Sequence, residues 1–224
     1  MNKLLTLSRN RRPHCTTQVT VLFSLSMRLA KIEYLIRTGS FARSLEWKSI
    51  LSDLRTAISS VVWPPNNSRF ILNPSTGRGR GEGNGVKPIK EACILTLKQL
   101  GWNIDERKNP LRLDATKSVG RKNVFGVEWE TGNISSSHRA INRLLRGYHD
   151  DLLVGGALIV PTRDLYRYLT DRVGNLAELE PYFKLWRATI SWKNGVLAII
   201  AVEHDGTDPK VLRITKGTDG RALI

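Results

Sequence analysis

The spacing of apolar residues along the chain predicts a mixture of helices and strands. Between positions 27 and 62, apolar residues recur every three or four positions, which predicts two helical segments. Their apolar faces carry Ile32, Leu35 and Ile36 in the first segment, and Ile50, Leu54 and Ile58 in the second. Another helix is predicted from Pro88, a residue suited to a first helical turn, to about Leu100.

The middle of the chain has the alternating pattern of β-strands. Positions 111 to 115 alternate around Asp114, and positions 124 to 130 form a second predicted strand. A helix follows from about Ser136 to Tyr148, with three serines available as its N-cap. The apolar run at 152–160 predicts a strand buried on both faces.

The last third of the chain continues this alternation. We predict a helix that includes Leu165, Tyr168 and Leu169, and then two β-like runs at 196–202 and 211–214. Strands that alternate with helices predict an α/β domain with a mixed central sheet.

The balance of charged residues indicates that the protein binds a polyanion. The 224 residues include 35 lysines and arginines against 20 aspartates and glutamates, a formal net charge of +15. Such an excess favours nucleic acid over a membrane surface, because neutralising phosphates releases counterions. The two cysteines are too few for a disulfide framework, and Cys93 lies on a helical apolar stripe, so we expect a reduced core thiol and a cytoplasmic protein.

The first 26 residues differ from the rest of the chain. They contain several basic residues but no acidic one, they have no sustained apolar period, and a second methionine follows at Met27. We therefore expect residues 1–26 to be an extension that is disordered or is not part of the native protein. Residues 27–224 are expected to form a single domain.

Residues 127–130 place two carboxylates on one face of a predicted strand. Because side chains alternate along a strand, Glu128 and Glu130 project to one side, while Val127 and Trp129 pack on the other. Adjacent carboxylates repel unless a proton or cation lies between them, and a hard divalent ion prefers oxygen ligands. Asp114 completes the cluster if the two strands pair. The alternative, which the pattern alone favours, is a pair of solvated glutamates.

Such a cluster suits the hydrolysis of a phosphodiester bond. A divalent metal polarises the phosphoryl oxygen and lowers the pKa of a water molecule, and a nearby base accepts the proton as that water attacks. The glycine- and arginine-rich stretch at 76–85 lacks the Walker pattern. We expect a loop there that either contacts phosphate or provides flexibility.

Five segments in order along the chain resemble the BamHI family of type II restriction endonucleases, most closely its shorter isoschizomer branch. They are 84–91 (NGVKPIKE), 128–136 (EWETGNISS) with His138 and Arg139, 168–173 (YLTDRV), 178–183 (ELEPYF) and 216–220 (KGTDG). The resemblance extends from about Met27 to the C-terminus. It implies a restriction-endonuclease-like, PD-(D/E)XK, α/β core: a mixed central sheet flanked by helices on both sides.

The resemblance also implies catalytic roles. Asp114 and Glu128 correspond to metal-binding acids, with the main-chain carbonyl of Trp129 as a further ligand. A third acid is expected at Glu106, which we prefer to its neighbour Asp105. Glu130 stands where most nucleases of this fold have lysine, and it corresponds to the general base. The expected cofactor is Mg²⁺, for which Mn²⁺ substitutes.

For DNA recognition, the resemblance implies a symmetric dimer that reads GGATCC and cuts after the first G. The positions that match the family's major-groove readers are Asn133, Ser135, Arg139, Asp171 and Arg172. Arginine donates two hydrogen bonds to guanine, and aspartate accepts one from cytosine. Minor-groove contacts are expected at Gly217 and Asp219, and phosphate contacts at Lys90 and Lys216.

The expected partners are therefore double-stranded DNA, a second copy of the chain and a companion DNA methyltransferase in the host. Without the resemblance, Asp171 and Arg172 would be interpreted as a surface ion pair. Two other functions stay open on the sequence: a repair or structure-selective metal nuclease, and a basic DNA-binding protein with inert carboxylates. Plasmid digestion separates the first from a restriction enzyme, and a failure to bind Mg²⁺ or Mn²⁺ favours the second.

Overall fold

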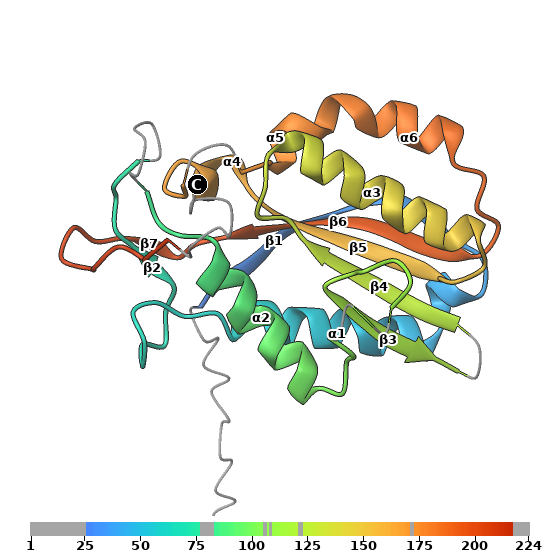
Figure 1. The fold of residues 1–224 in the computed structure, drawn as a ribbon, viewed down its shortest axis with the longest axis horizontal. Coiled ribbons are helices and arrows are strands. Elements are labelled where there is room, and N and C mark those ends of the chain that lie inside the picture. Colours follow the sequence, from blue (N-terminus) through green and yellow to red (C-terminus); the bar gives the residue numbers. More distant parts are fainter. Residues whose placement is uncertain are drawn as a thin grey trace, which may run out of the picture.

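A five-stranded mixed sheet forms the centre of the molecule in the computed structural model (Figure 1). The structure describes residues 26–76, 83–104, 107, 109–120, 123–170 and 173–216. Helices cover both faces of the sheet, which confirms the predicted α/β class. The predicted extension at 1–26 lies outside the described residues apart from Ser26, as do positions 77–82 of the glycine- and arginine-rich stretch.

The three inner strands run parallel to one another. They are β4 (Asn123–Trp129), β5 (Gly155–Pro161) and β6 (Gly195–Glu203). Each edge strand is antiparallel to its neighbour: β1 (Arg28–Thr38) pairs with β6, and β3 (Ala115–Val119) pairs with β4. All residues of β5 and β6 are buried, as the continuous apolar runs predict for strands that are covered on both faces.

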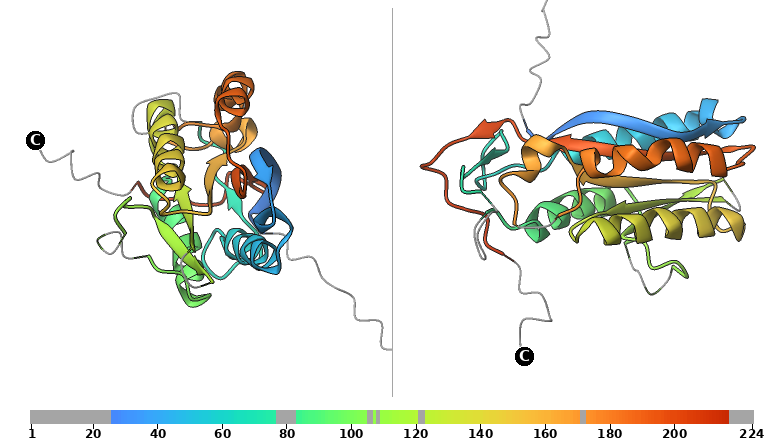
Figure 2. Two further views of the ribbon diagram at one scale, coloured as in Figure 1. Left: turned by 90° about the vertical axis from the view of Figure 1, so that its right-hand side faces the viewer. Right: turned by 90° about the horizontal axis from the view of Figure 1, so that it is seen from above.

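Two helical layers enclose the sheet, as Figures 1 and 2 show. One face carries α1 (Leu45–Ser59) and α2 (Lys87–Gln99), and the other carries α3 (Ile134–His149) and α6 (Phe183–Thr189). Shorter elements complete the chain: the helices α4 (Arg163–Tyr166) and α5 (Leu176–Leu179), 3₁₀ turns at Phe41–Arg43 and Glu180–Tyr182, and a parallel pair of β2 (Ile71–Leu72) and β7 (Gly206–Thr207).

Alternate residues of the inner strands supply the two cores. On the α1 and α2 side, Phe125 packs among Trp47 and Cys93, and on the α3 side, Leu158 packs among Leu144 and Ile199. Burial raises the pKa of the Cys93 thiol to about 12, so this cysteine is the neutral core thiol that the sequence predicts. No helix in the described part of the chain combines the length and the apolar character needed to span a bilayer.

The first predicted helix is wrong, because residues 28–38 form the edge strand β1. Its pairing with β6 shifts register twice, between Leu29 and Lys31 and between Tyr34 and Ile36. Such irregularities interrupt the two-residue alternation of a strand. Neighbouring residues Leu35 and Ile36 are both buried as a result, which imitates the spacing of a helix.

Two further elements are shorter than predicted. Arg112 has a positive φ of 52°, and β3 begins only at Ala115, so the strand predicted at 111–115 is wrong over most of its length. The helix predicted through Leu169 ends at Tyr166. Beyond it, Leu169 forms an isolated parallel bridge with Asn84.

The second predicted strand in the tail is also wrong, because residues 211–214 belong to neither sheet of the described chain. Side chains hold their backbone instead. The Trp63 Nε1 donates a hydrogen bond to the Leu212 carbonyl at 2.8 Å, and the Asn73 Nδ2 donates one to the Val211 carbonyl at 2.7 Å. An apolar pattern alone does not distinguish this arrangement from a strand.

Candidate active site

Three carboxyl groups, those of Asp114, Glu128 and Glu130, line one cavity where β4 leaves the sheet. The antiparallel pairing of β3 with β4 brings Asp114 beside Glu128, as expected if the two strands pair. The Asp114 Oδ2 accepts a hydrogen bond from the Trp129 amide at 2.7 Å. Glu128 and Glu130 are only 6% and 8% exposed, which contradicts the alternative of two solvated glutamates. Val127 and Trp129 pack into the core on the α1 and α2 side, as the strand alternation predicts.

Two cations face these carboxylates from helices on opposite sides of the sheet. The Lys90 Nζ, on α2, lies 2.5 Å from the Asp114 Oδ1. The Arg143 Nη1, on α3, lies 3.1 Å from the Glu128 Oε1, but its hydrogen bond goes to the Arg112 carbonyl, also at 3.1 Å. The buried Glu128 Oε1 therefore has a charged neighbour and no hydrogen-bond donor within the described chain.

The surroundings of the two glutamates disfavour their charged forms. Burial raises the pKa of Glu128 to about 8, and the negative charge of Asp114 adds to this effect, whereas Arg143 and Lys90 oppose it. Burial also raises the pKa of Glu130, against hydrogen bonds from the Gly132 and Thr131 amides. At neutral pH the Glu128 carboxyl therefore favours either a proton or a neighbouring cation.

A cavity of about 220 Å³ opens over the carboxylates. The three acids line it together with the basic side chains of Lys90, Arg112, Arg139 and Arg143. Acidic groups at the base of a basic, polar cavity suit an anionic substrate that arrives with a metal ion.

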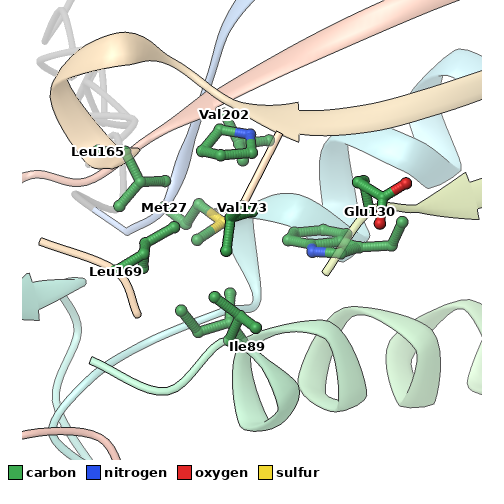
Figure 3. Close-up of a pocket in the computed structure, with 10 residues that line it drawn as sticks. Met27, Ile89, Glu130, Leu165, Leu169, Val173 and Val202 are labelled. Atoms are coloured by element: carbon green, nitrogen blue, oxygen red, sulfur yellow. The ribbon is translucent and has the colours of Figure 1, made fainter. Parts of the chain in front are cut away.

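A separate apolar pocket lies behind Glu130 (Figure 3). Side chains from distant parts of the chain surround it, among them Met27, Ile89, Leu165 and Val202. Its volume of about 10 Å³ is that of a single water molecule, so it is an imperfection of the core and no ligand site. The Glu130 carboxylate lies at its edge, beyond the apolar side chains.

The carboxyl oxygens of this cluster are ligands that suit a hard divalent cation. The Glu128 Oε1 is a buried carboxyl oxygen without a hydrogen-bond donor, and Asp114 provides a second carboxyl group. Within the described ranges, no three acidic, histidine or cysteine side chains are arranged so that together they could hold a metal ion. Mg²⁺ does not require three protein side chains, because it keeps several waters and binds through one or two carboxylates. The predicted third acid, Glu106, and its alternative Asp105 lie outside the described residues.

The predicted DNA-reading residues of α3 follow directly after the carboxylates. Asn133 caps the helix, since its Oδ1 accepts a hydrogen bond from the Ser136 amide at 3.2 Å. The predicted helix is thus confirmed, but it begins two residues earlier, at Ile134, and the predicted serine cap is wrong. Ser135 lies exposed in the first turn, and Arg139 lies exposed one turn later, where its Nη2 donates to the Ser136 Oγ at 2.7 Å.

The other predicted contacts lie on separate segments. Lys90 reaches the cluster from α2, and Lys216 is exposed at the end of the last described segment. Four predicted DNA contacts lie outside the described residues: Asp171, Arg172, Gly217 and Asp219.

Sequence reasoning missed Arg143. It stands four residues after Arg139, and this spacing places both side chains on one face of α3. The four-residue spacing from Arg139, a predicted base reader, was therefore the signal that could have identified Arg143. Using this signal requires knowing that this face of α3 is turned toward Glu128 at the end of β4, and only the folded sheet shows that.

Comparison with known proteins places this arrangement in a family. A family model described as restriction endonuclease BamHI matches residues 27–221. The type II restriction enzyme OkrAI of Oceanobacter kriegii is 47% identical over 203 residues, which cover 88% of this chain and 100% of that relative. The type II restriction enzyme BamHI of Bacillus amyloliquefaciens is 33% identical over 182 residues, which cover 75% of this chain and 80% of that relative. The chain therefore belongs to the BamHI family of type II restriction endonucleases, with the restriction-endonuclease-like fold that its mixed sheet displays.

Proposed function

We propose that this type II restriction endonuclease hydrolyses double-stranded DNA at GGATCC, after the first G, with Mg²⁺ as its cofactor. The observation that carries the proposal is the buried, donor-free Glu128 Oε1 beside Asp114, at the base of a cavity lined by basic side chains. The proposed sequence rests on the match of Asn133, Ser135 and Arg139 to the readers of the family.

In this proposal Asp114 and Glu128 would hold the Mg²⁺, together with the main-chain carbonyl of Trp129 and the carboxylate of Glu106. Bound Mg²⁺, or Mn²⁺ in its place, polarises a phosphate oxygen and lowers the pKa of nearby water. In the metal-free protein Lys90 pairs with Asp114, and Arg143 lies beside the Glu128 carboxyl, whose raised pKa favours its neutral form.

Glu130 is the proposed general base, which accepts a proton from the attacking water. Its raised pKa brings the carboxylate closer to the working pH, where a general base is most effective. The Gly132 amide donates to the Glu130 Oε1 at 2.5 Å and so orients the carboxylate. Lys90 and Arg143 line the same cavity and are placed to neutralise the phosphate.

Sequence recognition is proposed for two sets of residues. The start of α3 presents Asn133, Ser135 and Arg139 to the major groove, where an exposed helix N-terminus also favours phosphate. The second set comprises Asp171 and Arg172 in the major groove, and Gly217 and Asp219 in the minor groove. Lys90 and Lys216 are proposed to contact phosphates, which positions the protein on DNA without specifying bases.

A palindromic site mirrors two-fold symmetry, so we propose a homodimer of chains that each use residues 27–224 as one endonuclease domain. Residues 1–26 are proposed to be an extension to this domain, apart from Ser26, which is buried in the described structure. A companion methyltransferase would protect the host's own sites.

Glu130→Ala tests the assignment of the base. We expect the variant to lose Mg²⁺-dependent cleavage and to keep most of its affinity for GGATCC duplexes, because the carboxylate acts on the water and leaves the base readers in place. Glu91→Ala is the matched control, since this exposed glutamate of α2 pairs only with Lys87 in the described structure. Cleavage by Glu130→Ala at the wild-type rate contradicts the assigned role.

A further inference from the structure

Asn84 lies outside the carboxylate cluster, yet all of its polar groups are bound to distant parts of the chain. The residue is fully buried. Its Nδ2 donates to the carbonyls of Asn73 at 2.9 Å and Tyr168 at 2.8 Å, and its Oδ1 accepts from the Ile214 amide at 3.1 Å. Its main chain donates to Tyr168 at 2.7 Å and accepts from Thr170 at 2.9 Å. One residue therefore joins three segments that are far apart in the sequence, and we call this contact the Asn84 junction.

The glycines on either side of Asn84 allow the backbones at the junction to approach closely. Gly83 has a φ of +85°, and a Cβ there would lie 2.5 Å from the Leu169 carbonyl oxygen. A Cβ on Gly85 would lie 2.3 Å from the Thr215 carbonyl oxygen. Because real Cβ atoms do not approach backbone oxygens so closely, any side chain at these positions would push the joined segments apart.

Two of the joined segments lead to proposed DNA contacts. Thr170 immediately precedes Asp171 and Arg172, and Ile214 stands two residues before Lys216. The following inference therefore rests on the proposed function. The Asn84 amide group binds both segments at once, through the Tyr168 carbonyl and the Ile214 amide, so it determines the distance between them.

The same junction is connected to the carboxylate cluster along two routes. Asn84 stands three residues before α2, whose Lys90 pairs with Asp114. On the other side of Asp171 and Arg172, the Gly174 amide donates to the Gly132 carbonyl at 2.8 Å. The segment that carries these two proposed readers is thus held at one end by Asn84 and at the other by the turn that follows Glu130.

We propose that Asn84 is a positioning residue for sequence discrimination. Its side-chain amide sets the relative positions of the segments that end at Thr170 and begin at Ile214, and so determines how well the enzyme distinguishes its site from sites that differ by one base pair. The amide is required because it donates twice and accepts once. An isosteric carboxylate would keep the acceptor for Ile214 and place an anionic oxygen against the carbonyls of Asn73 and Tyr168.

The test compares wild type, Asn84→Asp and Asn84→Ala in equilibrium binding without divalent cations, at one salt concentration. The probes are a duplex that contains GGATCC and duplexes with one base pair of the site changed. We expect the ratio of noncognate to cognate Kd to fall by about tenfold or more, which is the loss of roughly one good base contact. We expect noncognate affinity, which phosphate contacts dominate, to change little. In Asn84→Ala, which removes the acceptor of the Ile214 amide, faster hydrogen exchange at that amide should accompany the loss.

Asn194→Ala is the matched control. The Asn194 Oδ1 also joins distant segments, since it accepts a hydrogen bond from the Phe41 amide at 2.8 Å. Asn194 immediately precedes Gly195, the first residue of β6, whereas Glu203 is the last residue of that strand. This variant should keep its discrimination even if its Tm falls. If the two Asn84 variants do not fold, Asn84→Ser is the milder change, and its discrimination should fall as well.

The possible failures are distinct. A wild-type protein that does not prefer GGATCC contradicts the proposed function, and this inference with it. A wild type that discriminates beside folded Asn84 variants that discriminate equally well refutes only the inference. Equal loss of cognate and noncognate binding also refutes it, because that result indicates a general structural defect.

Discussion

The buried Glu128 carboxyl should make the stability of the metal-free protein depend on pH, and Glu128→Gln should remove much of that dependence. Burial raises the pKa of Glu128 from an ordinary value of 4.5 to about 8. Between these values the unfolded chain has released a proton that the folded protein still holds, so a rise in pH favours unfolding. The stability that the neutral carboxyl contributes is complete below pH 4.5 and is lost as the pH rises through about 8.

The size of the effect follows from the shift in pKa. One pKa unit corresponds to about 1.4 kcal/mol, so the full shift corresponds to at most about 5 kcal/mol. Most of it falls between about pH 5 and pH 8, where we expect the free energy of unfolding of the wild type to decrease by about 3 kcal/mol. The glutamine has the same shape and no proton to release, so the decrease in the variant should be smaller by that amount.

Urea unfolding in the presence of a chelator, across this pH range, measures the difference. Glu91→Gln is the control, because its side chain is 62% exposed and its substitution should leave the wild-type decrease unchanged. An equal decrease in the wild type and in Glu128→Gln would show that the buried carboxyl is not its source. Added Mg²⁺ should reverse the decrease in the wild type, because a metal that binds only the folded protein stabilises it.

Three further predictions concern DNA. Arg139→Ala should lower discrimination at one guanine by about 1–3 kcal/mol in binding to duplexes changed at that base pair, and uniform weakening across all duplexes would contradict a reading role. Gly132→Ala should slow single-turnover cleavage by about tenfold to a hundredfold, because the new Cβ would lie 2.7 Å from the Ser136 Oγ and 3.0 Å from the Glu130 Oε1; a wild-type rate would show that the turn tolerates a side chain. Lys216→Ala should reduce the slope of log Kd against log salt by about 0.9, whereas an unchanged slope would exclude a phosphate contact.

The parts of the fold that the sequence predicts are those whose local pattern matches their surroundings. The strands β5 and β6 are covered on both faces, so their residues are continuously apolar whichever way they point. The edge strand β1 was mistaken for a helix because two register shifts place Leu35 and Ile36 side by side in the core. A bulge depends on the partner strand, and no local period reveals it.

The same distinction applies to the functional residues. Glu128 and Glu130 stand out because they are neighbours on one strand, and Asp114 because its strand precedes theirs. Arg143 and Asn84 could not be predicted in this way. Arg143 meets Glu128 only after α3 has packed on the sheet, and Asn84 meets Tyr168 and Ile214 across 84 and 130 positions of sequence.

Mapping the cleaved ends on one sequenced plasmid tests the central claim most directly. With Mg²⁺, the wild-type protein should produce discrete fragments whose ends all lie at GGATCC, each strand cut after the first G, while Glu130→Ala leaves the plasmid intact. Cuts at another sequence would contradict the proposed specificity. Nicks or smears without a common sequence, or fragments of the same kind from Glu130→Ala, would contradict the proposed site-specific mechanism.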